Sequence, residues 1–272
     1  MPPTLPSPSE TLPRSPSDPR QILARAREHA PAAPLPRELL DQLLACLDER
    51  AALVQRAAAD ELVRFAPVEP RIEARLRDRL EASDAAVRRV AAFTLARLGA
   101  RASRLVPVLI EALGDASSEV RWSAHHALRL VGQQTASAAA ALLAATRAPS
   151  PTLRRMALYS VRDWDVPSEA LAETVLEALG DPDANVRLAA LAAASTGRDP
   201  SARTASAVLA LVETDPRPGV RRAAAAALAK IASREPGEGA RDRTRGTLER
   251  VVRDPDPRLR KAARAALRIL DS

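Results

Sequence analysis

The stretch LGDPDANVR, residues 179–187, contains a Val–Arg pair that marks one unit of a repeating pattern. An equivalent apolar residue, followed by arginine in six of seven copies, recurs at steps of 33, 33, 33, 33, 34 and 39 residues. A nearly fixed period of this length is typical of repeat proteins, in which each unit packs on its neighbours. The seven anchor residues are Val54, Val87, Val120, Leu153, Val186, Val220 and Leu259.

Each repeat is predicted to contain two helices, the second of which begins near the anchor. Positions 0, 4, 8 and 11 counted from the anchor fall within about 80° of arc on an α-helix, so they form one buried stripe. Alanine occupies position 4 in every copy, which lets the shorter, apolar first helix approach closely. These alanines are Ala58, Ala91, Ala124, Ala157, Ala190, Ala224 and Ala263.

Composition supports an all-α protein. The chain is 46% hydrophobic and 28% charged, but its 2% aromatic content is too low for one large core. No apolar run is long enough to span a membrane, and the N-terminal residues lack the apolar segment of a signal peptide. The single cysteine, Cys46, has no partner within the chain and is expected to be structural. We therefore expect a soluble, cytoplasmic protein.

The sequence divides into three parts. Residues 1–19 are rich in proline and serine and are expected to be a disordered tail. Residues 20–36 are expected to contain a short helix and a proline-rich linker, and residues 37–272 contain the repeats. The longest step between anchors includes residues 233–246, where proline, three glycines and many charges predict a loop insertion.

Three strings resemble the HEAT repeat: Leu179–Arg187, LGDPDANVR; Arg253–Arg260, RDPDPRLR; and Leu105–Leu113, LVPVLIEAL. The most similar form is the short bacterial repeat named after phycobilisome (PBS) lyases, and the resemblance covers residues 37–271. It implies a right-handed α-solenoid of about seven helical hairpins, an armadillo-like helical fold whose second helices line a concave surface.

The resemblance also implies a ladder of Asp and Arg side chains that hydrogen-bond along the stack. Ala82 and Ala148 replace the aspartate in two repeats and Gln55 replaces the arginine in another, so the ladder is interrupted. Arginines held in this way would be structural rather than a basic stripe for nucleic acid. The expected pairs are Asp115 and Arg121, Asp181 and Arg187, Asp215 and Arg221, and Asp254 and Arg260.

The expected concave surface carries aromatic and arginine residues in the second to fourth repeats, at positions 2, 6 and 9 from the anchor. In the later repeats position 6 is always alanine. Because aromatic residues and arginine are enriched at interface hot spots, we expect a protein or peptide partner to bind at this surface. The surface consists of Arg89, Phe93, Trp122, His126, Arg129, Arg155, Tyr159 and Arg162.

Catalytic and cofactor motifs are lacking from the sequence. The adjacent His125 and His126 point about 100° apart on a helix, so they do not suit one metal ion. Deoxyhypusine hydroxylase, an iron enzyme of similar architecture, uses His-Glu pairs, and this chain has no such dipeptide. We therefore expect a scaffold without catalytic activity, cofactor or metal. Two alternatives are nucleic-acid binding, as in HEAT-like DNA glycosylases with Asp60 or Asp163 as carboxylate, and a bilin lyase or isomerase subunit.

Overall fold

A computed structural model shows that the chain is built from helices. No strand occurs in the part of the chain that the structure describes, which confirms the all-α prediction. The fold is an α-solenoid of helical hairpins. Most of the predicted tail and the first residues of the predicted loop lie outside the described residues. These comprise residues 18–99, 105–131, 136–164, 168–196, 202–232 and 238–271.

The described residues up to Gly99 form a first compact unit. Its first helix begins after Asp18, whose carboxylate accepts a hydrogen bond from the Arg20 N–H at 2.9 Å. Proline at the next position suits the start of a helix because its missing N–H would have no intrahelical acceptor there. α2 pairs with α3 and α4 pairs with α5, so this unit holds the first two predicted hairpins. Its helices are α1 (Pro19–Glu28), α2 (Arg37–Cys46), α3 (Ala52–Phe65), α4 (Arg71–Arg79) and α5 (Ala85–Arg97).

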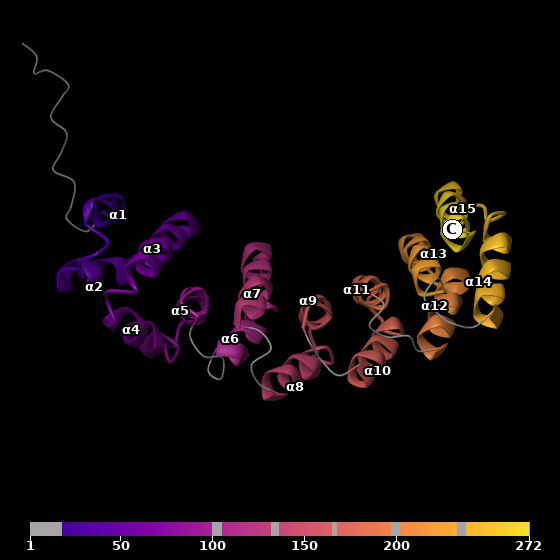
Figure 1. The fold of residues 1–272 in the computed structure, drawn as a ribbon, viewed down its shortest axis with the longest axis horizontal. Coiled ribbons are helices and arrows are strands. Elements are labelled where there is room, and N and C mark those ends of the chain that lie inside the picture. Colours follow the sequence, from indigo (N-terminus) through magenta and orange to yellow (C-terminus); the bar gives the residue numbers. More distant parts are fainter. Residues whose placement is uncertain are drawn as a thin grey trace, which may run out of the picture. The chain divides into compact units, whose positions relative to one another are not determined.

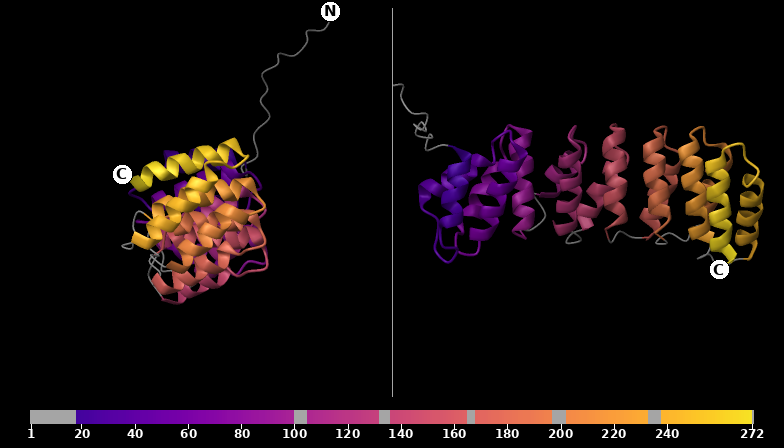
Figure 2. Two further views of the ribbon diagram at one scale, coloured as in Figure 1. Left: turned by 90° about the vertical axis from the view of Figure 1, so that its right-hand side faces the viewer. Right: turned by 90° about the horizontal axis from the view of Figure 1, so that it is seen from above.

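Residues 101–272 form the second unit, which holds the other five hairpins. Within this unit the odd-numbered helices pack side by side in one layer and the even-numbered helices form the other, as Figures 1 and 2 show. The helices are α6 (Leu105–Ala112), α7 (Ser118–Val131), α8 (Ala136–Ala145), α9 (Pro151–Arg162), α10 (Ser168–Leu179), α11 (Ala184–Ala194), α12 (Ala202–Thr214), α13 (Pro218–Ala232), α14 (Glu238–Val251) and α15 (Pro257–Asp271).

The alanine column lies in the core of both units. All seven alanines at position 4 have 0% exposure, which confirms the predicted helical phase. Phe65 and Trp164, at position 11 of their repeats, are also buried. Small side chains in the column let helices pack closely, while these two aromatic residues fill larger spaces in a core that has few of them.

Cys46 is buried at the end of α2, as expected for a structural residue. Burial, together with the nearby Glu49 and Asp48 carboxylates, raises the pKa of its thiol to about 11. The thiolate is the reactive form of cysteine, so this side chain is poorly reactive at neutral pH.

The prediction of a loop at residues 233–246 is wrong for residues 238–246, which are helical. α14 begins at Glu238 and continues through Gly239 and Gly246, beside α15 (Figure 1). Its Thr244, Thr247 and Leu248 are buried against neighbouring helices, while the four arginines of this helix are exposed. Tertiary packing of this face offsets the low helix propensity of the two glycines, which is about 1 kcal/mol each relative to alanine.

Candidate functional site

The ladder arginines at position 1 are anchored to main-chain carbonyls. In the fourth and fifth repeats, Arg154 Nη1 lies 3.0 Å from the Ala148 carbonyl oxygen and Arg187 Nη1 lies 2.8 Å from that of Asp181. Arg121, Arg221 and Arg260 donate in the same way to the carbonyls of Asp115, Asp215 and Asp254. Each expected Asp–Arg pair within a repeat is therefore joined through the aspartate main chain, so alanine at this position keeps the contact.

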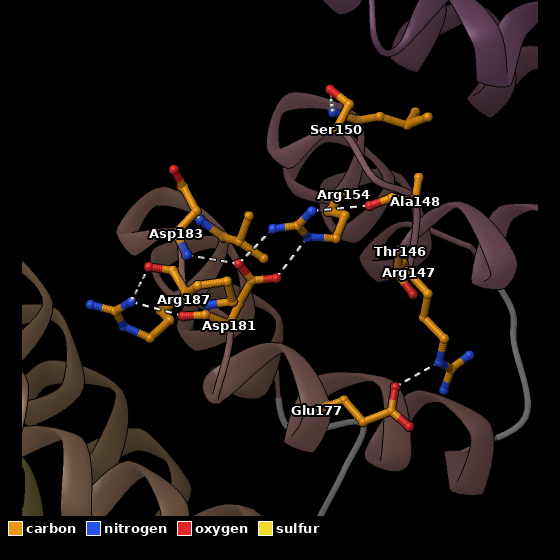
Figure 3. A network of polar contacts seen from close by, with 12 residues as sticks. Thr146, Arg147, Ala148, Ser150, Arg154, Glu177, Asp181, Asp183 and Arg187 are labelled. Atoms are coloured by element: carbon orange, nitrogen blue, oxygen red, sulfur yellow. Dashed lines mark hydrogen bonds and ion pairs between the residues drawn. The ribbon is translucent and has the colours of Figure 1, made fainter.

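The aspartate carboxylates make different contacts from those expected. Asp181 accepts two hydrogen bonds from Arg154 of the preceding repeat, at 2.7 and 2.8 Å from Nε and Nη2 (Figure 3). Asp215 accepts the same pair from Arg187, at 2.7 and 3.0 Å. For Asp181 and Asp215 the expected carboxylate pair within one repeat is thus corrected, because each carboxylate binds the arginine of the preceding repeat.

These carboxylates also stabilise the turn before each second helix. Asp181 accepts a hydrogen bond from the Asp183 N–H at 2.8 Å, and Asp115, Asp215 and Asp254 accept equivalent bonds two residues ahead. Burial opposes ionisation of Asp181, but the bonds from Arg154 and the Asp183 N–H hold its pKa below the usual value. Arg154 and Arg187 are therefore occupied by the fold and are not part of an open basic stripe.

The predicted partner surface is divided between the two units. Arg89 and Phe93 lie on α5 in the first unit and are half-buried. The other six residues lie on α7 and α9, neighbouring helices of the second unit. We call these six the α7–α9 patch: Trp122, His126, Arg129, Arg155, Tyr159 and Arg162.

Aromatic stacking organises the α7–α9 patch. The Trp122 and Tyr159 rings are 6.0 Å apart between centroids and inclined by 20°, and Trp122 meets the His125 ring edge to face at 5.6 Å. The Arg162 guanidinium lies 5.8 Å from the centre of the Tyr159 ring. Trp122 is nevertheless 55% exposed. It therefore does not fill the core, and it presents a large apolar surface in a fixed orientation.

Basic side chains surround the aromatic pair. His126 and Arg129 are exposed on α7, and neither makes a hydrogen bond or ion pair with the described residues. Arg155 is half-buried, and its buried Nε has no hydrogen-bond partner within the described parts of the chain. Farther along the same layer, Arg222 is paired with Asp256 at 3.2 Å. Arg162 is paired with Asp163, whereas no carboxylate among the described residues pairs with Arg129 or Arg155. The α7–α9 patch thus combines apolar surface with the positive charge of these two arginines.

Sequence reasoning did not identify His125 as part of this cluster. Its side chain is buried between α7 and α9, with Nδ1 3.0 Å from Ser160 Oγ and Nε2 3.4 Å from an Asp163 carboxylate oxygen. The other Asp163 oxygen accepts a hydrogen bond from Arg162 Nε at 2.9 Å. One feature of the sequence could have identified it. At position 5 from the anchor, the second to sixth repeats carry alanine or leucine, except for this histidine in the third repeat.

The Ser–His–Asp grouping does not form a catalytic triad. The Ser160 hydroxyl is fully buried and donates to the Met156 carbonyl at 3.0 Å, so it accepts the hydrogen of His125 Nδ1. A hydroxyl that is buried and already donating is not available to attack a substrate. The grouping instead holds the His125 ring, and hence the edge of Trp122, in place. No cluster of potential metal ligands occurs among the described residues.

Stability is expected to fall as His125 becomes protonated. Burial lowers the pKa of this imidazole; Asp163 raises it, and Arg162, Arg129 and His126 lower it. Because the unfolded pKa is about 6.5, the unfolded state binds the proton first, so stability is complete above that pH and declines below it. His125→Leu should lose this part of the pH dependence. Urea unfolding between neutral pH and about pH 5.5 would test it, and equal declines in both proteins would contradict a buried neutral His125.

Comparison with known proteins agrees with this architecture. The family model for HEAT repeats matches residues 73–162 and 139–229, which together make up more than half of the chain. The chain belongs to the HEAT-repeat family. No curated protein sequence matches it. None of the described helices has the length and apolar character needed to cross a bilayer.

Several solved structures share the fold at low sequence identity. A mutant of the karyopherin Kap121p has a TM-score of 0.63 and 14% identity over 92% of this chain and 31% of its own. Kap121p bound to the extreme C-terminus of the phosphatase Cdc14p also has a TM-score of 0.63, with 13% identity over 92% and 32%. The Escherichia coli protein YibA has a TM-score of 0.53 and 15% identity over 95% and 98%. This chain therefore spans about a third of the karyopherins it resembles.

Proposed function

We propose that this protein is a non-enzymatic scaffold that binds an extended segment of a partner protein on the α7–α9 patch. The main support is Trp122, which is 55% exposed although it stacks on Tyr159. A tryptophan ring that stays exposed adds little buried apolar area to the folding of the chain alone. A partner that covers the ring would gain its apolar area without ordering a flexible side chain.

The fold is also suitable for such a role. Kap121p and Kap95p have similar folds, and their structures include complexes with the Cdc14p C-terminus and with RanGDP. Solenoids present one layer of helices as a long surface on which an extended chain can lie. The prediction that Arg89 and Phe93 on α5 bind a partner concerns the first unit and stays a prediction. The single, buried Cys46 is compatible with a cytoplasmic location.

Nucleic-acid binding is the second candidate, because Arg129 and Arg155 on the patch have no neighbouring carboxylate partner among the described residues. Two observations make it less favourable. Arg154 and Arg187 are bound to Asp181 and Asp215. The carboxylates that a glycosylase-like activity would need are also engaged: Asp60 pairs with Arg97 at 2.7 Å, and Asp163 pairs with Arg162. The bilin lyase alternative rests on the PBS lyase form of the repeat alone.

Selection from a library of random short peptides tests the proposed function. We expect peptides that bind wild-type protein and bind the Trp122→Ala variant at least about tenfold more weakly. Random-sequence duplex DNA serves as the comparison, because phosphate contacts make affinity fall steeply with salt. A failure to select any peptide, together with salt-sensitive DNA binding, would favour the nucleic-acid alternative and contradict the scaffold.

A further inference from the structure

The inter-repeat ladder lacks its acid at the step that carries the α7–α9 patch. At the next two steps, a carboxylate from the following repeat pairs with the arginine of the preceding one: Asp181 with Arg154, and Asp215 with Arg187. At the α7 to α9 step the corresponding residue is Ala148, which has no carboxylate to offer Arg121. Arg121 makes no ion pair within the described parts of the chain.

The Arg121 guanidinium is nevertheless held as its two counterparts are. Arg121 Nη1 donates to the carbonyls of Asp115 and Ala116, both at 2.8 Å. Arg154 makes the same pair of main-chain bonds at 3.0 and 2.9 Å, and Arg187 makes them at 2.8 and 3.1 Å. The Nε and Nη2 of Arg154 bind the Asp181 carboxylate through two hydrogen bonds (Figure 3), and the same atoms of Arg187 bind Asp215. The same anchoring prepares the Nε and Nη2 edge of Arg121 for a carboxylate.

We infer that Arg121 receives a carboxylate from the bound partner, in the place that Asp181 and Asp215 take at the following steps. This inference rests on the proposed function and specifies its ligand as an acidic, extended peptide. Arg121 and Trp122 are consecutive residues near the start of α7, so one peptide can contact both. The acidic side chain binds Arg121 while a neighbouring apolar residue covers Trp122.

Charge on the surrounding surface favours an acidic ligand. Arg129, Arg155 and His126 lie on the same two helices, and no acidic residue occupies positions 2, 6 or 9 of α7 or α9. A cationic peptide would be repelled by this surface. A planar carboxylate fits two parallel guanidinium N–H groups, and it is the ligand that Arg154 and Arg187 already bind.

Restoring the acid of the ladder tests the inference without altering Arg121. The carboxylate that Ala148→Asp introduces should pair with Arg121 and raise the thermal unfolding midpoint above that of Ala148→Asn. The difference should disappear as the pH falls below about 4, where the carboxylate becomes protonated. Ala82→Asp and Ala82→Asn are the matched controls, because the residue one step earlier is Gln55, an uncharged side chain bonded to the Glu49 carbonyl. This control pair should show no comparable difference.

The same variants test the ligand. Peptides selected on wild-type protein should be enriched in Asp and Glu, and changing the critical acid to its amide should weaken binding to wild type by about tenfold. That change should have little effect on binding to Ala148→Asp, whose own carboxylate occupies Arg121. Ala82→Asp should bind each peptide as wild type does.

Three results would overturn the inference. One is equal stability of Ala148→Asp and Ala148→Asn. Another is that the selected peptides lack acidic residues, need Trp122 for binding and bind Ala148→Asp as tightly as wild type. The proposed function would then stand, but its ligand would be different. The third is that no peptide is selected, while the protein binds duplex DNA and Ala148→Asp weakens this DNA binding. Arg121 would then receive a phosphate, and the proposed function would fail as well.

Discussion

Leu128→Asp is expected to destabilise the protein by about 3 kcal/mol or more, the scale of burying an unpaired charge. Leu128 has 0% exposure and lies on the stripe of α7 between Ala124 and Val131. A carboxylate there would lose its hydration without gaining a cation or hydrogen-bond donor. Urea unfolding followed by circular dichroism measures the change in free energy, and we expect the midpoint to fall strongly.

Ala226→Asp is the matched control for this substitution. Ala226 is exposed on α13, at position 6, where the repeat places its side chains away from the stripe. The same chemical change there should alter stability by less than about 0.5 kcal/mol, as usual for surface positions. Similar effects at both positions would contradict the helical phase on which the assignment of the stripe and of the α7–α9 patch depends.

The fold was largely predictable because its signal repeats. A buried alanine in each of seven repeats fixes the helical phase, and Phe65 and Trp164 follow from the same count of positions. α14 was mispredicted where the local sequence is least typical of a helix. Its Thr244, Thr247 and Leu248 are buried by packing against other helices, a contribution that local propensity does not contain.

The candidate site was predictable only in part. Position within the repeat identified Trp122 and Tyr159, but not that their rings stack or that Trp122 remains exposed. His125 was missed because its partners, Ser160 and Asp163, are more than one repeat away in the sequence. The ladder residues were recognised, but the arginines that bind the Asp181 and Asp215 carboxylates were assigned to the wrong repeat.

Replacing Trp122, Arg155 and Tyr159 together by alanine is expected to weaken partner binding strongly while changing stability little. The exposed Trp122 and the half-buried Arg155 and Tyr159 lie outside the stripe, so their removal should lower the urea midpoint only slightly. Loss of hot-spot side chains costs about 2 kcal/mol or more each, so binding should weaken by at least about 100-fold. The matched control replaces Lys261 and Arg268, exposed residues at positions 2 and 9 of α15.

The most direct test of partner binding at the α7–α9 patch is the Kd of a selected peptide for these two variants and wild type, measured by fluorescence anisotropy. The account predicts that the triple variant stays folded and loses the peptide, while the Lys261 and Arg268 variant binds as wild type does. A folded triple variant that binds with unchanged Kd, or a loss of binding confined to the Lys261 and Arg268 variant, would contradict it.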